Sequence, residues 1–400
     1  MRRLTCIFSA FIFLLSFNIA NGQVKEVRVD FYRNAFHAMI DTSVLLNLPQ
    51  TFTDKSLKES FATISSKKYQ PLIDSLLKYK EQYKLNDWLY YQLIRRVAQQ
   101  ISPKEDNYER YTFYKWFMLA QSGYDARLAL AHNKIIFYVY NDEDISDIPF
   151  FIVDGKQFAC LNYHDYAKTD LNTDPPVPVK LPIAVAKKPF SYKVTMMPEF
   201  KPEHEIERKI TFTYEHKPYY FSIKLNSDRE KAFNNYPGVS FDTYFNIPLS
   251  KEAYSSLIPL LKKNIQGMDQ KKGVDYLMRF TRYAFLYEND QENFGREKRM
   301  SPEETLFANR SDCDDRAALF YYLVKEIYNL PMIAMLYPTH ITMAVCFNQP
   351  VGQPILYKGR YYSLCEPTPE LEDLQIGQMA AKLKDVPYHI VYQYEPLGAQ

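Results

Sequence analysis

The feature that most constrains the fold lies in residues 309–366. There, one long apolar helix pattern is followed by three β-type segments. The helix pattern opens in "NRSDCDDRAALFYYLV", residues 309–324. We expect Pro331 to end it, because proline lacks an N–H group and clashes within a helix. Its core-facing positions recur every three or four residues, at Leu319, Phe320, Leu323, Val324 and Ile327. The segments "MIAMLY", "HITMAVCF" and "RYYSLCE" have the composition of β-strands. This order predicts an α+β unit in which a helix packs on an antiparallel sheet.

Cys313 stands among acidic residues where the helix pattern begins. A helix N-terminus favours a thiolate through its dipole and its free N–H groups. Asp312, Asp314 and Asp315 act in the opposite direction, since nearby negative charge raises the pKa of a thiol. The same carboxylates are good helix caps and can bond outward to arginines. From this stretch alone, a buried core cysteine and a nucleophile both stay open.

His340 lies at the start of the second β-type segment, and Glu366 lies at the end of the third. In two neighbouring antiparallel strands the start of one faces the end of the other, so these side chains are expected to meet. The helix must pack on this sheet, which would bring Cys313 to the histidine. A cysteine, a base and an orienting carboxylate would then form a nucleophilic triad.

The motifs "DCDDRAALFYYLVKEIYNLP", "YPTHITMAV" and "YYSLCEPT" resemble, in this order, the bacterial transglutaminase-like superfamily, which has a papain-like cysteine-enzyme fold. The resemblance covers residues 260–370. It implies Cys313 as the nucleophile, His340 as the base and acid, and Glu366 as the orienting carboxylate. The family usually has an aspartate where this chain has Glu366, which is longer by one methylene. For the oxyanion donor that the family adds to the cysteine N–H group, Tyr287 and Gln291 are candidates.

The resemblance implies a secreted cysteine enzyme that acts on amide or peptide bonds through a thioester acyl-enzyme. Hydrolysis, as in a peptidase or amidase, is favoured over cross-linking. The expected substrate is a peptide, a protein or a cell-wall-type amide. The alternative is a catalytically inactive secreted binding or scaffold protein with the same fold. Glu366 in place of aspartate favours this alternative, whereas the complete set of Cys313, His340 and Glu366 favours an enzyme.

The first 22 residues read as a secretory signal peptide. A basic start, an apolar run over residues 4–20 and small residues up to Gly22 follow one another in the expected order. This predicts export to the periplasm or the exterior, and a retained membrane anchor is the alternative. No later run is apolar enough to span a bilayer, so no stable membrane span is expected after cleavage.

Charge and cysteine usage give no sign of nucleic acid, metal or cofactor. The net charge is +2 without a basic block, and neither a C-x-x-C pair nor H-E-x-x-H occurs. The alternation of strand residues sets Cys346 and Cys365 on opposite faces of the sheet. A disulfide between them is therefore not expected, and Cys313 is expected to be free.

The chain divides into four predicted parts after the signal peptide. Residues 23–168 open with a strand and are then mainly helical, and residues 169–182, rich in proline, form a linker. Residues 183–250 are expected to form a β-rich domain, with a hairpin around "EHKP" and a further strand at "SFDTYFNI". Residues 251–400 hold the transglutaminase-like domain.

A weaker version of the same pattern order occurs in residues 23–168. "NDWLYYQLIRRVA" parallels "VDYLMRFTRYAFL", and "NKIIFYVYN" parallels "THITMAVCFN". An internal repeat would set Asn107, Lys134 and Asn162 near the places of the three site residues, so the first, degenerate copy would lack thiol chemistry. Two unrelated helix-hairpin segments are the alternative, since such units are common.

Overall fold

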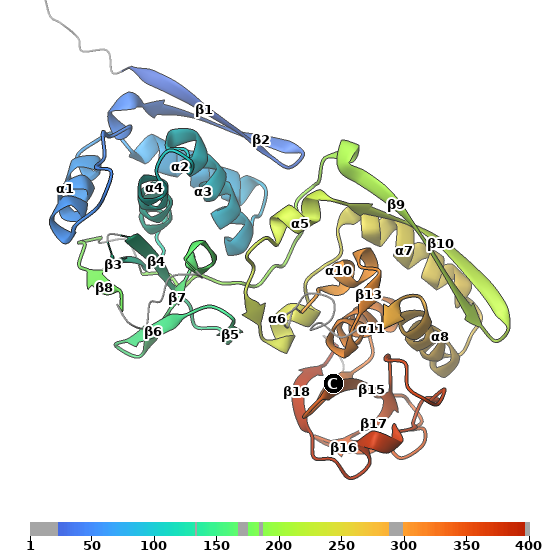
Figure 1. Ribbon diagram of the computed structural model, residues 1–400. Helices are drawn as coiled ribbons and strands as arrows, with labels where there is room; N and C mark the ends of the chain where they lie inside the picture. The colour runs from blue at the N-terminus through green and yellow to red at the C-terminus, as the bar shows by residue number, and fades with distance from the viewer. Residues whose placement is uncertain (1–22, 133, 167–174, 184–186, 288–298, 397–400) are drawn as a thin grey trace, which may run out of the picture.

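The computed structural model describes residues 23–132, 134–166, 175–183, 187–287 and 299–396. In these residues the chain is an α+β protein of helices and mainly antiparallel sheets, so the predicted class is confirmed. It has two halves side by side, each with a long hairpin, a layer of helices and a five-stranded sheet (Figure 1).

The first half opens with the hairpin β1 (Val24–Phe31) and β2 (Asn34–Asp41), which packs on α2 (Gln70–Gln82) and α3 (Asp87–Ile101). The other helices are α1 (Asp54–Ser65) and α4 (Tyr108–Gln121), and α4 packs on the sheet. The strands of that sheet, in the order β6-β7-β4-β3-β8, are β3 (Ala126–Ala131), β4 (Lys134–Tyr140), β6 (Phe150–Val153), β7 (Lys156–Cys160) and β8 (Val177–Val179).

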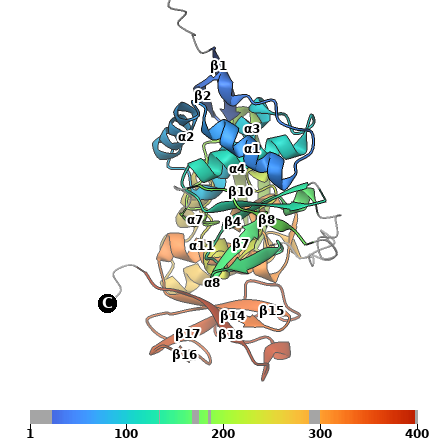
Figure 2. The same cartoon turned by 90° about the vertical axis from the view of Figure 1, so that its left-hand side faces the viewer.

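The second half repeats this plan. The hairpin β9 (Glu205–Tyr214) and β10 (Lys217–Asn226) packs on α7 (Lys251–Asn264) and α8 (Gln270–Tyr283). Helix α11 (Cys313–Tyr328) packs on the sheet, which lies beneath the helices in Figure 2. Its strands, in the order β16-β17-β15-β14-β18, are β14 (Met332–Tyr337), β15 (His340–Val345), β16 (Ile355–Tyr357), β17 (Arg360–Cys365) and β18 (His389–Tyr394).

Short elements connect these layers. Two short strand pairs are β5 (Ile145–Ser146) with β11 (Gly238–Val239) and, in parallel, β12 (Leu286–Tyr287) with β13 (Arg310–Ser311). The short helices are α5 (Asp228–Ala232), α6 (Phe241–Phe245) and α10 (Pro302–Phe307).

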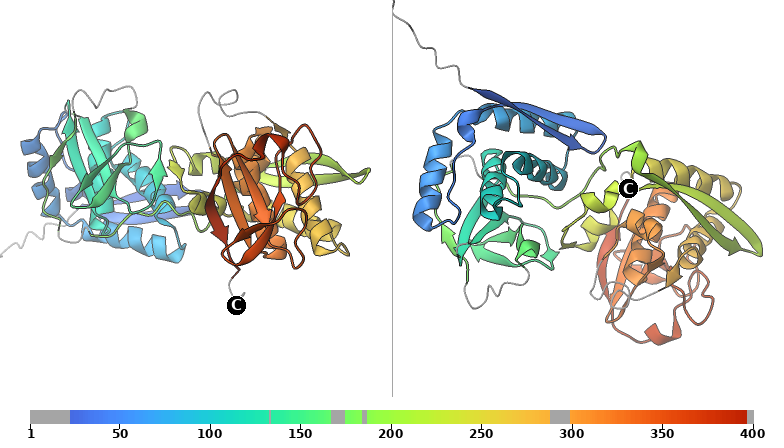
Figure 3. Two further views of the ribbon diagram at one scale, coloured as in Figure 1. Left: turned by 90° about the horizontal axis from the view of Figure 1, so that it is seen from below. Right: turned by 45° about the horizontal axis from the view of Figure 1, so that its top comes forward.

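The two five-stranded sheets have the same topology. Counted along the chain, the strands of each sheet lie in the order third, fourth, second, first, fifth. Their first hairpins also match in register, because Ala131 pairs with Lys134 in one and Tyr337 pairs with His340 in the other. The view from below shows the sheets next to each other, and the tilted view shows both long hairpins (Figure 3). The fold thus supports the internal repeat, which includes the hairpins.

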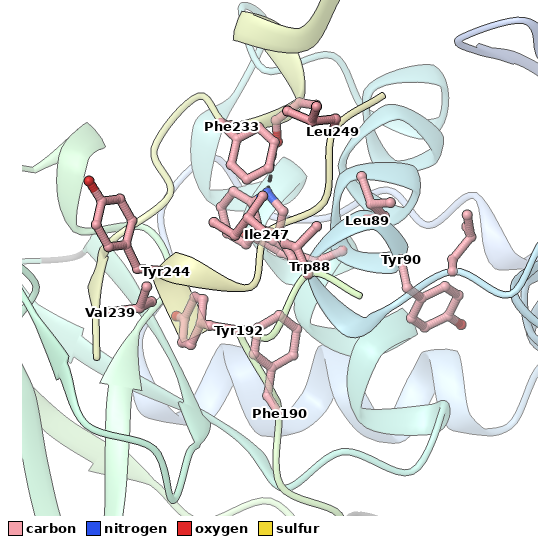
Figure 4. Close-up of a cluster of buried hydrophobic side chains, with 14 of the residues drawn as sticks. Trp88, Leu89, Tyr90, Phe190, Tyr192, Phe233, Val239, Tyr244, Ile247 and Leu249 are labelled. Atoms are coloured by element: carbon pink, nitrogen blue, oxygen red, sulfur yellow. Dashed lines mark hydrogen bonds between the residues drawn. The ribbon is translucent and has the colours of Figure 1, made fainter. Parts of the chain in front are cut away.

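One hydrophobic core runs through both halves. Where they meet, Trp88 of α3 packs beside Tyr192, and Phe190, Phe233 and Ile247 lie around them (Figure 4). The indole Nε1–H of Trp88 donates to the carbonyl oxygen of Ala232 at 2.7 Å. The halves are therefore joined by buried apolar contacts.

Three expectations about the middle of the chain need correction. Residues 177–179, inside the predicted linker, form the edge strand β8, which pairs with β3. The stretch "SFDTYFNI" holds the helix α6 instead of a strand, because its buried aromatic residues recur at helical spacing. The predicted β-rich domain has no core of its own, since its hairpin packs on α7 and α8. Residues 169–174 and the predicted signal peptide lie outside the described residues.

Candidate active site

The acidic run around Cys313 forms the N-terminal cap of α11. The side chain of Asp312 accepts hydrogen bonds from the N–H groups of Asp314 and Asp315, and the N–H of Asp312 donates in turn to the carboxylate of Asp315. Asp315 also accepts from the N–H of Met300 at 2.8 Å and from the hydroxyl of Tyr244. This capping box fixes Cys313 as the first residue of the helix.

The surroundings of Cys313 disfavour its thiolate form. Burial raises its pKa well above the ordinary range, and the Asp314 and Asp312 carboxylates raise it further, whereas a hydrogen bond with the N–H of Ile341 lowers it. Asp314 Oδ1 is 3.5 Å from the sulfur, and its other oxygen is 3.5 Å from Arg299. The sequence-based concern about the flanking aspartates therefore applies to Asp314 and Asp312.

His340 and Glu366 are in direct contact. The Nε2–H of His340 donates to Oε2 of Glu366 at 2.9 Å, and both side chains are 4% exposed. The N–H of Thr368 donates to the other carboxylate oxygen at 2.9 Å, which fixes its orientation. The register pairs Met343 with Cys365, so the site residues meet diagonally rather than directly opposite each other. Nδ1 of the ring makes no hydrogen bond to any residue that the structure describes.

Cys313 lies beside the strand that carries the histidine. Its sulfur meets the N–H of Ile341, the residue after His340. Among the described residues, the sulfur hydrogen bonds with Asp314 rather than with the imidazole ring. The structure thus joins two of the three predicted site residues. Cys313 packs on the face of the sheet that carries Ile341, whereas the alternation along β15 turns His340 towards the face of Cys346.

Two buried arginines, which the sequence did not single out for the site, form its frame. Arg282 of α8 donates through Nε and Nη2 to the carbonyl oxygen of Glu366. Arg316 of α11 donates to the carbonyl oxygens of Thr281, Arg282 and Phe285 at 2.7–3.1 Å. These bonds connect the helix of the thiol, through α8, to the backbone of the carboxylate. An arginine within an apolar helix pattern is the only signal that the sequence offers.

The expectations for the other cysteines and for the two oxyanion candidates can be compared with the structure only in part. Cys160, Cys313, Cys346 and Cys365 are free thiols, and Cys346 and Cys365 pack into cores on opposite sides of the sheet, as the alternation predicted. Tyr287 pairs through its backbone with Ser311, close to Cys313 in the chain. Gln291 lies outside the described residues.

A cavity of about 1300 Å³ lies between the two halves, beside the first turn of α11. Arg299 and Tyr244 line it, and each also contacts an aspartate of that turn. Tyr163 and His164 line it from the first half. The cavity is thus large enough for a peptide segment, but Cys313, His340 and Glu366 are not among the residues that line it.

The described residues also include a group whose donor atoms could hold a metal ion. The ligand atoms of His340, Glu366 and Glu370 lie within 4.8 Å of one another. No sequence signature predicted it, because the histidine comes from a strand and the glutamates from the segment after another strand.

The first half has other residues at the equivalent places. Lys134 begins β4 as His340 begins β15, and the matching registers set Asn162 at the place of Glu366, as predicted. Asn107 caps α4, so it matches Asp312, and Tyr108 holds the place of Cys313. Asn162 bonds to the backbone of Ile135 and Phe137, and these residues offer no thiol.

Fold and site together define a two-part α+β protein with a thiol at a helix N-terminus and an imidazole–carboxylate pair on the adjoining sheet. No family model, curated protein or solved structure matches the chain. Within the described part of the chain, no helix combines the length and apolarity needed to cross a membrane.

Proposed function

We propose that this protein is a secreted transglutaminase-like cysteine enzyme that hydrolyses amide or peptide bonds. The observation that carries the proposal is the hydrogen bond of 2.9 Å between Nε2 of His340 and Glu366. Because the carboxylate holds the proton on Nε2, Nδ1 is free to accept the proton of a thiol. The sulfur of Cys313 contacts the same strand through the N–H group of Ile341.

The reaction follows from these roles. His340 takes the proton of Cys313, and the thiolate attacks the carbonyl carbon of the amide. His340 then gives this proton to the leaving amine, the C–N bond breaks and a thioester forms. Water, deprotonated by His340, attacks the thioester and releases the acid and the thiol. The substrate is a peptide, a protein or a cell-wall-type amide.

A second candidate is a catalytically inactive binding or scaffold protein. The environment of Cys313 favours it, since burial and two carboxylates raise the thiol pKa and the sulfur is bonded to Asp314. The use of glutamate at position 366 points the same way.

A substrate screen separates the two candidates. The secreted protein is incubated with peptides and peptidoglycan fragments, with and without added amines, and the products are identified by mass spectrometry. Hydrolysis that is absent in Cys313→Ala supports the enzyme. Products that contain the added amine would show transfer instead, and tight binding without any turnover would support the binding protein.

A further inference from the structure

Glu370 is a second carboxylate beside the His340–Glu366 pair. Its side chain is 10% exposed, and its ligand oxygen lies within 4.8 Å of those of the other two. The ammonium of Lys382 is 2.7 Å from Oε1 of Glu370, an ion pair without hydrogen-bond geometry. Two poorly solvated carboxylates this close repel each other, so the site attracts cations.

Two further buried oxygen atoms here lack a partner. The hydroxyl groups of Tyr337 and Thr368 hydrogen bond to nothing in the described residues. Tyr337 pairs with His340 across the β14–β15 hairpin, and its ring packs against that of Tyr388. Thr368 is bonded to Glu366 through its N–H. A buried oxygen without a partner is unfavourable, so both atoms are available to a ligand bound at this site.

We propose that His340, Glu366 and Glu370 bind a divalent first-row transition metal ion, with Zn²⁺ as the best fit. One imidazole nitrogen and two carboxylates are a ligand set that zinc takes, and a fourth position is left for water or a hydroxyl group. Lys382 is then a competing cation. Its side chain is 57% exposed, so its ammonium can leave Glu370 when the metal arrives.

The metal blocks the base. When Nε2 of His340 binds the ion, the ring proton moves from Nε2 to Nδ1, and no proton leaves the ring. Nδ1 then carries a hydrogen and cannot accept the proton of Cys313. The ion is therefore an inhibitor of thiol chemistry. This consequence rests on the proposed function, whereas the binding itself does not.

Titration with the metal alone tests the site. ZnCl₂ is added to full-length Cys313→Ala protein in a calorimeter, and Co²⁺ is followed by its visible absorption, so that the thiol takes no part. We expect one ion per chain. Glu370→Gln should weaken binding by about tenfold or more. Lys382→Gln should tighten it several-fold, because the competing ammonium is gone.

Glu372→Gln is the matched control, because this exposed glutamate of the same segment is not among the ligands. Circular dichroism verifies that each variant folds. Because Lys382 is exposed, Lys382→Gln tests the site without a substitution in the buried region. No binding, equal affinity in Glu370→Gln and Glu372→Gln, or no gain in Lys382→Gln would overturn the site. Binding without thiol reactivity in the wild type would retain the metal site and refute the enzyme.

Discussion

Nε2 of His340 and Oε2 of Glu366 lie 2.9 Å apart in a place that is almost closed to solvent. The two residues come from neighbouring strands, and the carbonyl oxygen of Glu366 is held by Arg282 from α8. This bond fixes which ring nitrogen faces away from the carboxylate, and several measurable consequences follow.

Changes at Glu366 should slow the chemistry. Glu366→Gln leaves a weaker acceptor for Nε2–H, so we expect hydrolysis to fall by about a hundredfold or more. Glu366→Asp should also lose activity, because the backbone is placed for the longer side chain. Steady-state kinetics on a cleaved peptide measure both. If Glu366→Asp were as active as the wild type, the longer side chain of Glu366 would not be required for the contact with His340.

Removal of the charge on Asp314 should make Cys313 more reactive. The carboxylate is 3.5 Å from the sulfur and raises the thiol pKa, so Asp314→Asn should lower it. The pH at which alkylation is half-maximal should fall by about one unit. Asp154→Asn, an exposed change in the first half, is the control. An unchanged or higher midpoint in Asp314→Asn would be inconsistent with this account.

Arg282→Lys should destabilise the second half. Lysine cannot reproduce the two bonds of the guanidinium to the Glu366 carbonyl, and we expect a loss of about 2–4 kcal/mol in the free energy of unfolding. Arg279→Lys is the matched control, because both arginines bind the carboxylate of Asp373 and, among the described residues, only Arg282 of the two binds Glu366. Urea unfolding compares the variants. If both variants lost the same free energy of unfolding, the hydrogen bonds from Arg282 to the Glu366 carbonyl would not contribute to stability.

Asp165 should make the stability of the first half depend on pH in the acid range. Burial alone would raise its pKa, but the close contact with His164 and the hydrogen bonds from Lys104 and Tyr108 outweigh it and hold the pKa well below the ordinary range. The stabilisation is therefore complete above the unfolded pKa of about 4 and is lost as the pH falls below it. Asp165→Asn should cost about 1–3 kcal/mol at pH 7 and less at pH 3.5. A difference in unfolding free energy that does not change with pH would refute this.

The sequence was informative where a local pattern determines the structure. The helix pattern that begins at Cys313 and the alternating strands were enough to predict that His340 and Glu366 meet, and the pairing of Lys134 with Ala131 follows the predicted repeat. The partners supplied by distant segments were not predictable. Arg282 binds a backbone carbonyl, and Glu370 joins the site through a loop, so no periodicity reports either contact.

The dependence of Cys313 on His340 is the central claim, and the rate of alkylation by iodoacetamide tests it most directly. The Cys313 peptide is quantified by mass spectrometry from pH 5 to 10 in the wild type and in His340→Ala. In the wild type the imidazole accepts the thiol proton, so labelling should be fast near pH 7. In His340→Ala it should be slower there by about a hundredfold and should rise only in strongly alkaline solution, because burial and the carboxylates raise the pKa of the thiol. Identical pH profiles in the two proteins would contradict the claim.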